Sequence, residues 1–484
     1  MGLGLDPERD RLLQAAMAAQ RAGRHDEAIA AFKRLIESNP DVSATPWVNL
    51  GIAYRATKKH RAALGCYRRA LELQPDDPDV LSNLGNVLKD LERIDDALAV
   101  HRKAVGLNPA DARLHHNYGV ALREAGEMDA ALAAFDITCR LAPDNAEAQW
   151  DRAIPLLHLG RFDEGWPAFE WRWRFGKIAK AFQDIPEWRG EDFAGKTLLV
   201  YPEQGFGDSI LASRFLPLAK LRGGEVVLMC KKPLLRLFDG LPGVDRTVSP
   251  GDRVGTFDYQ CPIMSLPAIF GTTRDNIPPP VKPAVPASSR EKFRPLIEVA
   301  GSRFKVGIVW SGSVTYVANA LRSTSIERFL KLAEIPGLQL FSLQKGPLER
   351  QLYDTGADAL MIDLGTRVED FADTAAVVEQ LDLVVMTDSA VAHLCGALGR
   401  PVWNLLNFVP GWFYGMSGET TPWYPSMRLI RQSTRGDWDS VFKVVAEGLM
   451  AAIAAKRRAA DAVVPGVAAR LEQERRSGGF TGES

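Results

Sequence analysis

The sequence predicts two architectures in series: a stack of paired helices in the first third, then two α/β domains built on parallel sheets. Three observations predict this. A motif of about 34 residues recurs from the N-terminus to about residue 175. Beyond Lys196, short apolar runs alternate with helical patterns, as expected of strands covered on both faces. A proline-rich bridge, IPPPVKPAVP from Ile277 to Pro286, divides this second part into two halves.

The composition is that of an ordinary globular protein. A chain of 484 residues has room for roughly two to four domains. A net charge of -1 indicates no general nucleic-acid partner. The five cysteines lie far apart without a C-x-x-C pair, which argues against a zinc site or a disulfide framework and favours a reducing compartment. The N-terminus carries no signal sequence, and no run approaches the roughly 20 apolar residues that span a bilayer. We therefore expect a cytoplasmic protein with no transmembrane segment.

The repeat is seen when four segments are aligned: GRHDEAIAAFKRLIESNP, KKHRAALGCYRRALELQP, ERIDDALAVHRKAVGLNP and GEMDAALAAFDITCRLAP. Their closing residues, Pro40, Pro75, Pro109 and Pro143, are separated by 35, 34 and 34 residues. The preceding helix of each unit repeats as well, with an Asn-x-Gly triplet in register. This pattern resembles the tetratricopeptide repeat, a helix-turn-helix unit. A degenerate fifth unit from Gly160 to Phe175 is expected to cap the stack.

A stack of such repeats curves and presents a concave face, which ordinarily binds an extended peptide or a partner protein. In this family the first helix of each unit lines that face. The candidate partner-binding residues on those helices are Asn49, Asn83, His116 and Asn117. An asparagine ladder could hydrogen-bond the backbone of a partner; alternatively, these side chains cap neighbouring turns or meet water. The two histidines, His115 and His116, have no acidic or cysteine neighbour in the sequence, so we do not expect metal ligands.

The segment from Gly176 to Gly195 has the composition of a linker. The first α/β half then contains three predicted strands, at 196–201, 225–230 and 257–263, and two predicted helices, one ending at Leu221 and one at 233–241. The second half contains predicted strands at 305–310 and 338–343 and helices at 325–334 and 370–381. Residues Leu381 to Trp403 follow as strand, turn, helix and strand. A last helix from Trp438 to about Ala460 precedes a polar tail, 461–484, that we expect to be disordered.

Glycines and polar side chains follow four of these strands. They are Gly205, Gly207 and Asp208; Ser311 and Gly312, with Arg322 further on; Gln344 and Lys345; and Asp388, Ser389, Ala390 and His393. Ligands bind at the carboxyl ends of parallel strands, so these turns are candidates for one cleft. Backbone donors with Arg322 and Lys345 suit a diphosphate, and Asp208 across the cleft suits a general base. The alternatives are that Asp208, Asp388 or Ser389 only caps a helix, and that His393 is a buried structural histidine.

Two of these turns carry a resemblance. GFGDSI at 205–210 together with DSAVAH at 388–393 is similar to the bacterial heptosyltransferase family, glycosyltransferase family nine. SLQKG at 342–346 and PWYPSMRLIRQ at 422–432 look like the bacterial proteins that join tetratricopeptide repeats to such a domain, among them flagellin-modifying enzymes. The resemblance implies a tetratricopeptide-repeat α-solenoid (1–175), a linker (176–195), and a GT-B fold of two Rossmann-like α/β domains (196–286 and 287–460).

The resemblance also implies an activity: a glycosyltransferase that needs no metal or other cofactor and moves a sugar from a nucleotide sugar to an acceptor hydroxyl. The acceptor would be a protein held by the repeats, flagellin being one candidate. Asp208 matches the proposed catalytic base of the family. Asp388, Ser389, Ala390 and His393 match the segment that holds the phosphate and sugar of the donor. Arg322 and Lys345 match basic positions near the phosphates.

The chain departs from the family pattern at two places in the donor-side domain. Ala320 and Leu321 precede Arg322, where many relatives carry an acidic residue. The sequence GWFY at 411–414 stands where many relatives carry D-W-R-W. Two other functions remain open: a transferase acting on lipopolysaccharide or exopolysaccharide, and a non-catalytic repeat scaffold with a degenerate transferase domain. The sequence names neither the donor nor the stereochemistry of transfer.

Overall fold

The computed structural model describes residues 7–41, 43–176, 179–252, 255–315 and 319–477, with side chains of the last helix described up to residue 459. The chain divides into two compact units, Met1–Ala179 and Lys180–Ser484. Within the described residues, no helix combines the length and the apolar run that crossing a bilayer requires.

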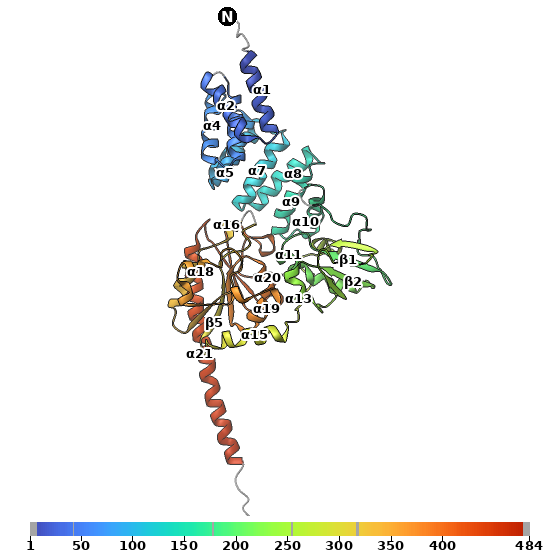
Figure 1. Ribbon diagram of the computed structural model, residues 1–484, viewed down its shortest axis with the longest axis vertical. Coiled ribbons are helices and arrows are strands. Elements are labelled where there is room, and N and C mark those ends of the chain that lie inside the picture. Colours follow the sequence, from blue (N-terminus) through green and yellow to red (C-terminus); the bar gives the residue numbers. More distant parts are fainter. Residues whose placement is uncertain (1–6, 42, 177–178, 253–254, 316–318, 478–484) are drawn as a thin grey trace, which may run out of the picture. The chain divides into compact units, whose positions relative to one another are not determined.

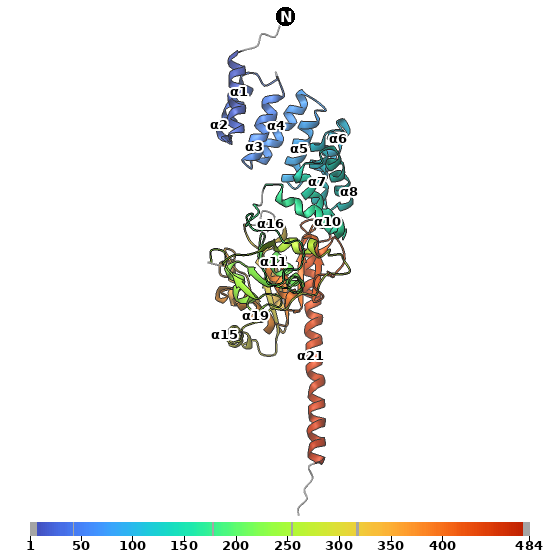
Figure 2. The same cartoon turned by 90° about the vertical axis from the view of Figure 1, so that its right-hand side faces the viewer.

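The first unit is a stack of helical hairpins (Figure 1). Within the described residues there are five hairpins, as the repeat predicted, and they form a curved row in the view of Figure 2. The helices are α1 (Pro7–Arg21), α2 (His25–Ser38), α3 (Thr45–Ala56), α4 (His60–Leu73), α5 (Pro78–Asp90), α6 (Ile94–Leu107), α7 (Ala112–Ala125), α8 (Met128–Leu141), α9 (Ala146–His158) and α10 (Phe162–Phe169), followed by the 3-10 helix η1 (Glu170–Trp173).

In three of the hairpins the first helix begins with an N-cap side chain, and these N-caps recur at the spacing of the repeat. The carboxylate of Asp77 accepts the N–H groups of Asp79 and Val80 at the start of α5. Asp111 caps α7 and Asn145 caps α9 in the same way. Each of these caps lies two residues after the proline that closes the preceding unit. An N-cap satisfies N–H groups that the helix itself leaves unpaired, so the repeat period also sets the helix boundaries.

The two helices of a hairpin meet where a glycine faces a ring. A Cβ atom on Gly51 would lie 2.7 Å from the Tyr67 ring, one on Gly85 2.5 Å from the His101 ring, and one on Gly119 2.8 Å from the Phe135 ring. No side chain fits between these pairs, so only glycine lets the helices approach so closely. In the third unit His101 takes the place that Tyr67 and Phe135 take in the second and fourth units.

The second unit contains two sheets in which every pairing is parallel. This confirms the predicted α/β architecture. The first sheet has the strand order β3-β2-β1-β4 and the second β10-β9-β8-β5-β6-β7. The strands are β1 (Thr197–Tyr201), β2 (Glu225–Met229), β3 (Arg246–Val248), β4 (Tyr259–Pro262), β5 (Phe304–Val309), β6 (Leu338–Ser342), β7 (Met361–Asp363), β8 (Leu383–Thr387), β9 (Val402–Leu406) and β10 (Met427–Arg431).

The sequence analysis missed three strands, β3, β7 and β10. All three lie at sheet edges. β3 and β7 have three residues each, and β10 carries two arginines. An edge strand pairs on one side only and needs neither a long nor a continuous apolar run, so its pattern in the sequence is weak.

Helices, most of them short, connect or follow the strands. They are α11 (Phe206–Ala212), η2 (Ser213–Phe215), α12 (Leu216–Lys220), η3 (Lys232–Leu234), α13 (Leu235–Phe238), η4 (Ile263–Ser265), α14 (Leu266–Ile269), α15 (Ala287–Glu298), α16 (Asn319–Arg322), α17 (Ile326–Leu330), η5 (Lys331–Glu334), α18 (Gln351–Asp354), η6 (Ala357–Ala359), η7 (Gly365–Arg367), α19 (Phe371–Gln380), α20 (Ala390–Ala397), η8 (Trp412–Tyr414) and α21 (Trp438–Ser477).

Most of the segment expected to be a linker belongs to the second unit, which begins at Lys180. Trp188 is fully buried, and its N–H donates to the carbonyl of Gln260 in β4 at 2.9 Å. Phe193 is also buried, and the Phe182 ring packs against Tyr201 of β1. These aromatic residues cover the first sheet, so the segment from Lys180 onward is part of that domain and not a free connector.

The last helix, α21, runs to Ser477, beyond the predicted end near Ala460. Its first turns pack on the second sheet through Val441, Val445 and Leu449, all buried. Further along it extends away from that sheet as a single helix (Figures 1 and 2). Residues 461–477, part of the tail expected to be disordered, belong to this helix. Alanine, leucine, glutamate and arginine in this stretch are strong helix formers. Residues 478–484 lie outside the described residues.

Candidate functional site

Two of the predicted turns meet in the second unit. The helix α11 follows β1 of the first sheet, and α20 follows β8 of the second, and the two helices pack against each other. A Cβ atom on Gly207 would lie 2.7 Å from Cδ2 of His393 and 3.5 Å from Cα of Ala390. The glycine therefore allows a backbone approach that brings Gly205–Asp208 beside Asp388–His393.

Asp208 is half-buried at the start of α11, where its Oδ2 accepts the N–H of Gly205 at 2.9 Å. The capping role considered for this residue is therefore present. Burial raises the pKa of the Asp208 carboxyl, backbone N–H groups oppose that effect, and the charge of Asp388 raises the pKa further. A raised pKa makes the ionised carboxylate a stronger base, which suits a group that takes a proton from a hydroxyl.

Asp388 is 7% exposed and bonds with two side chains from elsewhere in its domain. Its Oδ1 accepts the hydroxyl of Tyr414 at 2.9 Å, and its Oδ2 lies 3.4 Å from Nη1 of Arg322. Burial raises the pKa of the Asp388 carboxyl, while Arg322 and Tyr414 act in the opposite direction. The sequence analysis did not foresee Tyr414, because it lies in the segment where the family pattern is absent.

Ser389 caps α20, and its Oγ accepts the N–H of Val391 at 3.4 Å. Ala390 begins that helix. His393 is 4% exposed, with Nδ1 3.2 Å from the hydroxyl of Tyr424 and its ring against Phe413. Burial lowers the pKa of His393 to about 3, so the ring is neutral at physiological pH. These surroundings match the alternative of a buried structural histidine.

The turn after β5 supplies Ser311, Gly312 and Arg322. A Cβ atom on Gly312 would lie 2.8 Å from Nη2 of Arg322, so the glycine leaves room for the guanidinium. The Oγ of Ser311 accepts Nδ2 of Asn319 at 3.0 Å and lies 2.9 Å from Oγ of Ser323. Ser311 is thus occupied in shaping the turn, whereas Arg322 reaches Asp388.

The structure brings Gln344 to the Ser311 turn and places the side chain of Lys345 beside Gly365. Gln344 is buried, and its Oε1 accepts the N–H groups of Trp310 and Ser311 at 3.1 and 3.0 Å. Gln344 therefore joins the ends of β5 and β6, and its amide oxygen already accepts two backbone hydrogen bonds. The side chain of Lys345 is exposed and donates to the carbonyl of Gly365, after the edge strand β7. β6 and β7 lie on the side of β5 opposite to β8. Donor binding by Gln344 and Lys345 stays a prediction.

In the first unit, three of the four predicted partner-binding residues bond within the stack. Asn49 donates to the carbonyl of Thr45 at 3.0 Å, and Asn117 donates to Oγ of Ser82 at 2.9 Å. His116 lies 2.9 Å from the carboxylate of Asp151, one unit further along. Asn83 lines a small pocket of about 310 Å³. Asn117 thus bonds the first helix of the preceding repeat, whereas Asn49 bonds its own helix. Partner binding by the asparagine ladder stays a prediction.

The sequence analysis looked for partners of His116 only among its neighbours in the sequence. It therefore missed Asp151, which lies 35 residues further along the chain. Its carboxylate is buried and also accepts Nη1 of Arg123 at 2.6 Å. Burial acts to raise the pKa of Asp151, but His116 and Arg123 together lower it. The same step joins Arg55 to Asp90 and Lys89 to Glu124, at 2.6 and 3.0 Å. A signal for such pairs exists in the sequence: opposite charges one repeat apart.

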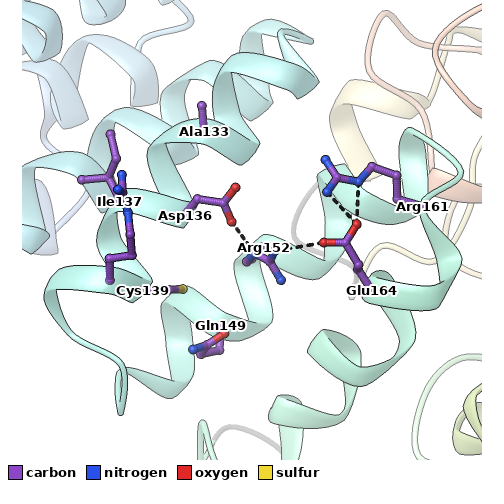
Figure 3. A pocket seen from close by; sticks show the side chains of 9 residues that line it. Ala133, Asp136, Ile137, Cys139, Gln149, Arg152, Arg161 and Glu164 are labelled. Atoms are coloured by element: carbon purple, nitrogen blue, oxygen red, sulfur yellow. Dashed lines mark hydrogen bonds and ion pairs between the residues drawn. The ribbon is translucent and has the colours of Figure 1, made fainter.

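A pocket of about 790 Å³ lies between α8, α9 and α10. Figure 3 shows that its charged side chains point toward one another: Arg152 lies between Asp136 and Glu164, and Arg161 pairs with Glu164 at 2.6 Å. The sequence analysis named none of these residues. These four charged side chains therefore form one network of ion pairs on the pocket wall, which Arg140 also lines.

Within the described ranges, no group of three or more His, Cys, Asp or Glu side chains could hold a metal ion. Two neighbouring carboxylates at the start of α19, Asp370 and Asp373, bond within the protein. Asp370 caps α19 by accepting the N–H of Asp373 at 3.0 Å, and Asp373 pairs with Lys292 at 2.7 Å. The metal-independent chemistry stays a prediction.

Residues 7–169 match the family model described as tetratricopeptide repeat, so the first unit is a tetratricopeptide-repeat domain. The chain is similar to Protein FlbA of Caulobacter vibrioides, with 26% identity over 309 residues, which cover 58% of this chain and 52% of that protein. This chain therefore spans about half the length of the curated relative that it matches.

Three solved structures that are similar to this chain each cover about a third of it. A Pseudomonas aeruginosa PilF structure is 21% identical with a TM-score of 0.33 and covers 35% of this chain and 78% of its own. YrrB, described as a TPR protein with an unusual peptide-binding site, is 21% identical with a TM-score of 0.29, covering 34% and 84%. A MamA structure is 20% identical with a TM-score of 0.30, covering 33% and 93%.

Proposed function

We propose that this protein is a glycosyltransferase of the GT-B type, which moves a sugar from a nucleotide sugar to an acceptor hydroxyl. One observation carries the proposal: Asp208 of the first sheet domain and Asp388 with Arg322 of the second lie in one cluster, where α11 packs on α20. Parallel-sheet domains bind ligands at the carboxyl ends of their strands, and all three residues follow such ends.

In the proposed reaction, Asp208 accepts the proton of the acceptor hydroxyl. The hydroxyl oxygen then forms a bond to the anomeric carbon of the sugar, while the bond from that carbon to the phosphate oxygen breaks. The departing phosphate carries the negative charge, which Arg322 and the N-terminus of α20 stabilise. His393 is neutral and serves as a wall of this corner, not as a cation.

The acceptor in this proposal is a protein. Tetratricopeptide repeats imply a peptide or protein partner, and they make up the first unit of the chain. The resemblance to flagellin-modifying transferases makes flagellin the first acceptor to test, through a serine or threonine hydroxyl. A polysaccharide acceptor is the alternative within the same reaction class.

The test is the intact mass of candidate acceptors from cells with the wild-type protein, with Asp208→Asn, and without the protein. We expect a mass increment of one or more sugars with the wild type only. The matched control is Asp239→Asn, an exposed carboxylate of the same domain, which should behave as wild type. Equal acceptor masses with and without the protein would reject a protein acceptor, and unchanged transfer by Asp208→Asn would reject the assigned base.

A second candidate is a scaffold that binds partners through its repeats without transferring a sugar. The close packing of Gly207 on His393 and of Tyr414 on Asp388 favours it, since both contacts fill the corner between the two turns. Under this function, Asp208→Asn would leave both the cellular phenotype and partner capture unchanged. Loss of the phenotype with partner capture retained would instead support the enzyme.

A further inference from the structure

The segment after β9 that departs from the family pattern is firmly built. Arg431, at the end of β10, donates to four backbone carbonyls of this segment: those of Tyr414 at 2.6 Å, Gly415 at 3.0 Å, Ser417 at 3.2 Å and Gly418 at 2.8 Å. The hydroxyl of Thr421 donates to the carbonyl of Phe413 at 2.7 Å. The replacement of the family motif is therefore an ordered wall that β10 and the following loop hold in place.

That wall contacts Asp388, which precedes α20, and His393, which lies within α20. The Tyr414 side chain is 3% exposed, and its hydroxyl donates to Oδ1 of Asp388 at 2.9 Å. The Phe413 ring meets the His393 ring edge-on, with centroids 4.9 Å apart. The hydroxyl of Tyr414 thus fixes one carboxylate oxygen of Asp388 and leaves the other for Arg322.

Asp388, held in this way by Tyr414, in turn contacts Arg322. Ala320 and Leu321, neither of them acidic, directly precede Arg322 in the sequence. The structure supplies a negative charge from Asp388 instead, whose Oδ2 lies 3.4 Å from Nη1 of Arg322. The guanidinium lies against Gly312, the residue that follows the β5 turn serine. Three elements, η8, the end of β8 and α16, therefore set where the positive charge of Arg322 lies.

We propose that Tyr414 is a positioning residue of the donor site: it orients Asp388, which in turn holds Arg322 beside Gly312 to receive an anionic phosphate. The identity of the ligand as a phosphate rests on the proposed function. The contacts from Tyr414 to Asp388 and from Asp388 to Arg322 do not depend on it. Tyr414 touches neither reacting atom, so its effect acts through Asp388 and Arg322 alone. The departure from the family motif is then a substitute for the lost acidic residue and not a loss of the site.

The first experiment needs no ligand. Phenylglyoxal modifies arginine guanidinium groups, and peptide mass spectrometry gives the rate at Arg322 in the full chain. Tyr414→Phe keeps the buried ring and removes only the hydroxyl, so we expect the rate at Arg322 to rise about three-fold or more as Asp388 loses its charge-assisted partner. Asp388→Asn should raise the rate as well, and combining the two should add little.

The matched control is Tyr353→Phe. Tyr353 also donates its hydroxyl to a carboxylate, Oδ2 of Asp363 at 2.6 Å, but beside the edge strand β7, three strands from β8. Removing that bond should leave the rate at Arg322 unchanged. Equal rates at Arg322 in the wild type and Tyr414→Phe would overturn the inference, whatever the activity of the protein.

The second experiment measures binding by thermal shift with CMP, CDP, UDP, GDP and ADP at several pH values. The charged and titratable groups around Asp388 are Arg322, Tyr414, Asp208 and the neutral His393. Because the Tyr414 hydroxyl lowers the pKa of Asp388, its removal raises that pKa. We expect Tyr414→Phe to bind the nucleotide about ten-fold more weakly and to lose affinity at a higher pH than the wild type as the solution is acidified.

The two experiments separate the two proposals. Nucleotide binding that is identical in Tyr414→Phe and the wild type would overturn the positioning role. Faster labelling of Arg322 in Tyr414→Phe, with no nucleotide stabilising the wild type, would keep the Tyr414–Asp388–Arg322 chain and reject the nucleotide-sugar donor.

Discussion

Both ring nitrogens of His101 are buried without a hydrogen-bond partner in the part of the chain that the structure describes. The ring takes the place that Tyr67 and Phe135 take in the flanking units and packs against Gly85. An unsatisfied buried polar group costs on the order of 1–3 kcal/mol. The His101 ring therefore fills the space beside Gly85, but its two unpaired ring nitrogens lower the stability of the folded protein.

We predict that His101→Phe stabilises the repeat stack by about 1–3 kcal/mol at pH 7, because a phenyl ring fills the same space without polar atoms. Urea unfolding of the full chain, followed by hydrogen exchange in α5, α6 and α7, measures this. A loss of stability in His101→Phe would show that an unlocated polar partner satisfies the histidine.

The same residue predicts an acid sensitivity. Burial lowers the pKa of His101 to about 4, below its usual value of about 6.5, so the unfolded chain takes up the proton first as the pH falls. Stability is complete above about pH 6.5 and falls by up to about 3 kcal/mol as the pH approaches 4. The stability difference between His101→Phe and the wild type should therefore grow from pH 7 to pH 4.5. A difference that is constant with pH would contradict this cause.

At the scale of elements, the first helices of successive repeats are joined by polar pairs. Asp151 of α9 accepts from both His116 and Arg123 of α7, and it is 6% exposed. Asp136 of α8 pairs with Arg152 of α9, but its side chain is 42% exposed. Buried and exposed ion pairs between neighbouring helices can thus be compared in one stack.

We predict that Asp151→Asn destabilises the junction of α7 and α9 by about 2–4 kcal/mol, since it leaves Arg123 without its buried charge partner. The matched change, Asp136→Asn, should cost less than about 1 kcal/mol, because solvent screens that pair. Hydrogen exchange of α7 and α9 reports the difference. Equal effects of the two substitutions would mean that burial does not set the strength of these pairs.

At the scale of the second unit, Arg214 joins the two sheet domains. It follows α11 in the first domain and is 2% exposed. Its Nη1 donates to the carbonyls of Trp423 and Pro278 at 2.9 and 3.3 Å, and the guanidinium lies over the rings of Trp423 and Tyr424. Since Tyr424 also contacts His393, one arginine connects the first domain to the α20 turn.

We predict that Arg214→Met makes the two sheet domains unfold less cooperatively and lowers the stability of the second unit by about 2 kcal/mol or more, because the lost bonds cross between them. Exposed Arg303, which bonds Gln339 within the second domain, gives the control Arg303→Met. Denaturant unfolding with hydrogen exchange of β1 and β8 measures both. A single sharp transition at the wild-type midpoint in Arg214→Met would reject this role.

Local patterns in the sequence predicted the repeat stack and the two parallel sheets. Closing prolines and recurrent glycines define helical hairpins, because each unit must bury the same face on its neighbour. The apolar runs of β1, β5 and β8 define central strands, because such strands are covered on both faces. The edge strands and the continuation of α21 lacked so clear a pattern.

The candidate site was predicted only in part, for a physical reason that Gln344 and Tyr414 illustrate. A turn after a strand tells which backbone lies at the sheet edge, but not where each side chain points. Gln344 turns inward to bond two backbone N–H groups, and Tyr414 comes from a segment whose sequence matched no pattern.

The sequence by itself therefore determined the order of domains, the hairpin period and the meeting of the Gly205–Asp208 and Asp388–His393 turns as candidates. Only the tertiary structure decided that Arg322 takes its counter-charge from Asp388, that Lys345 faces Gly365, and that His116 pairs with Asp151. The periodic pattern of apolar residues can be recognised from neighbouring positions in the sequence. These partners lie 20 to 66 residues apart, and only the packing of the folded chain brings them together.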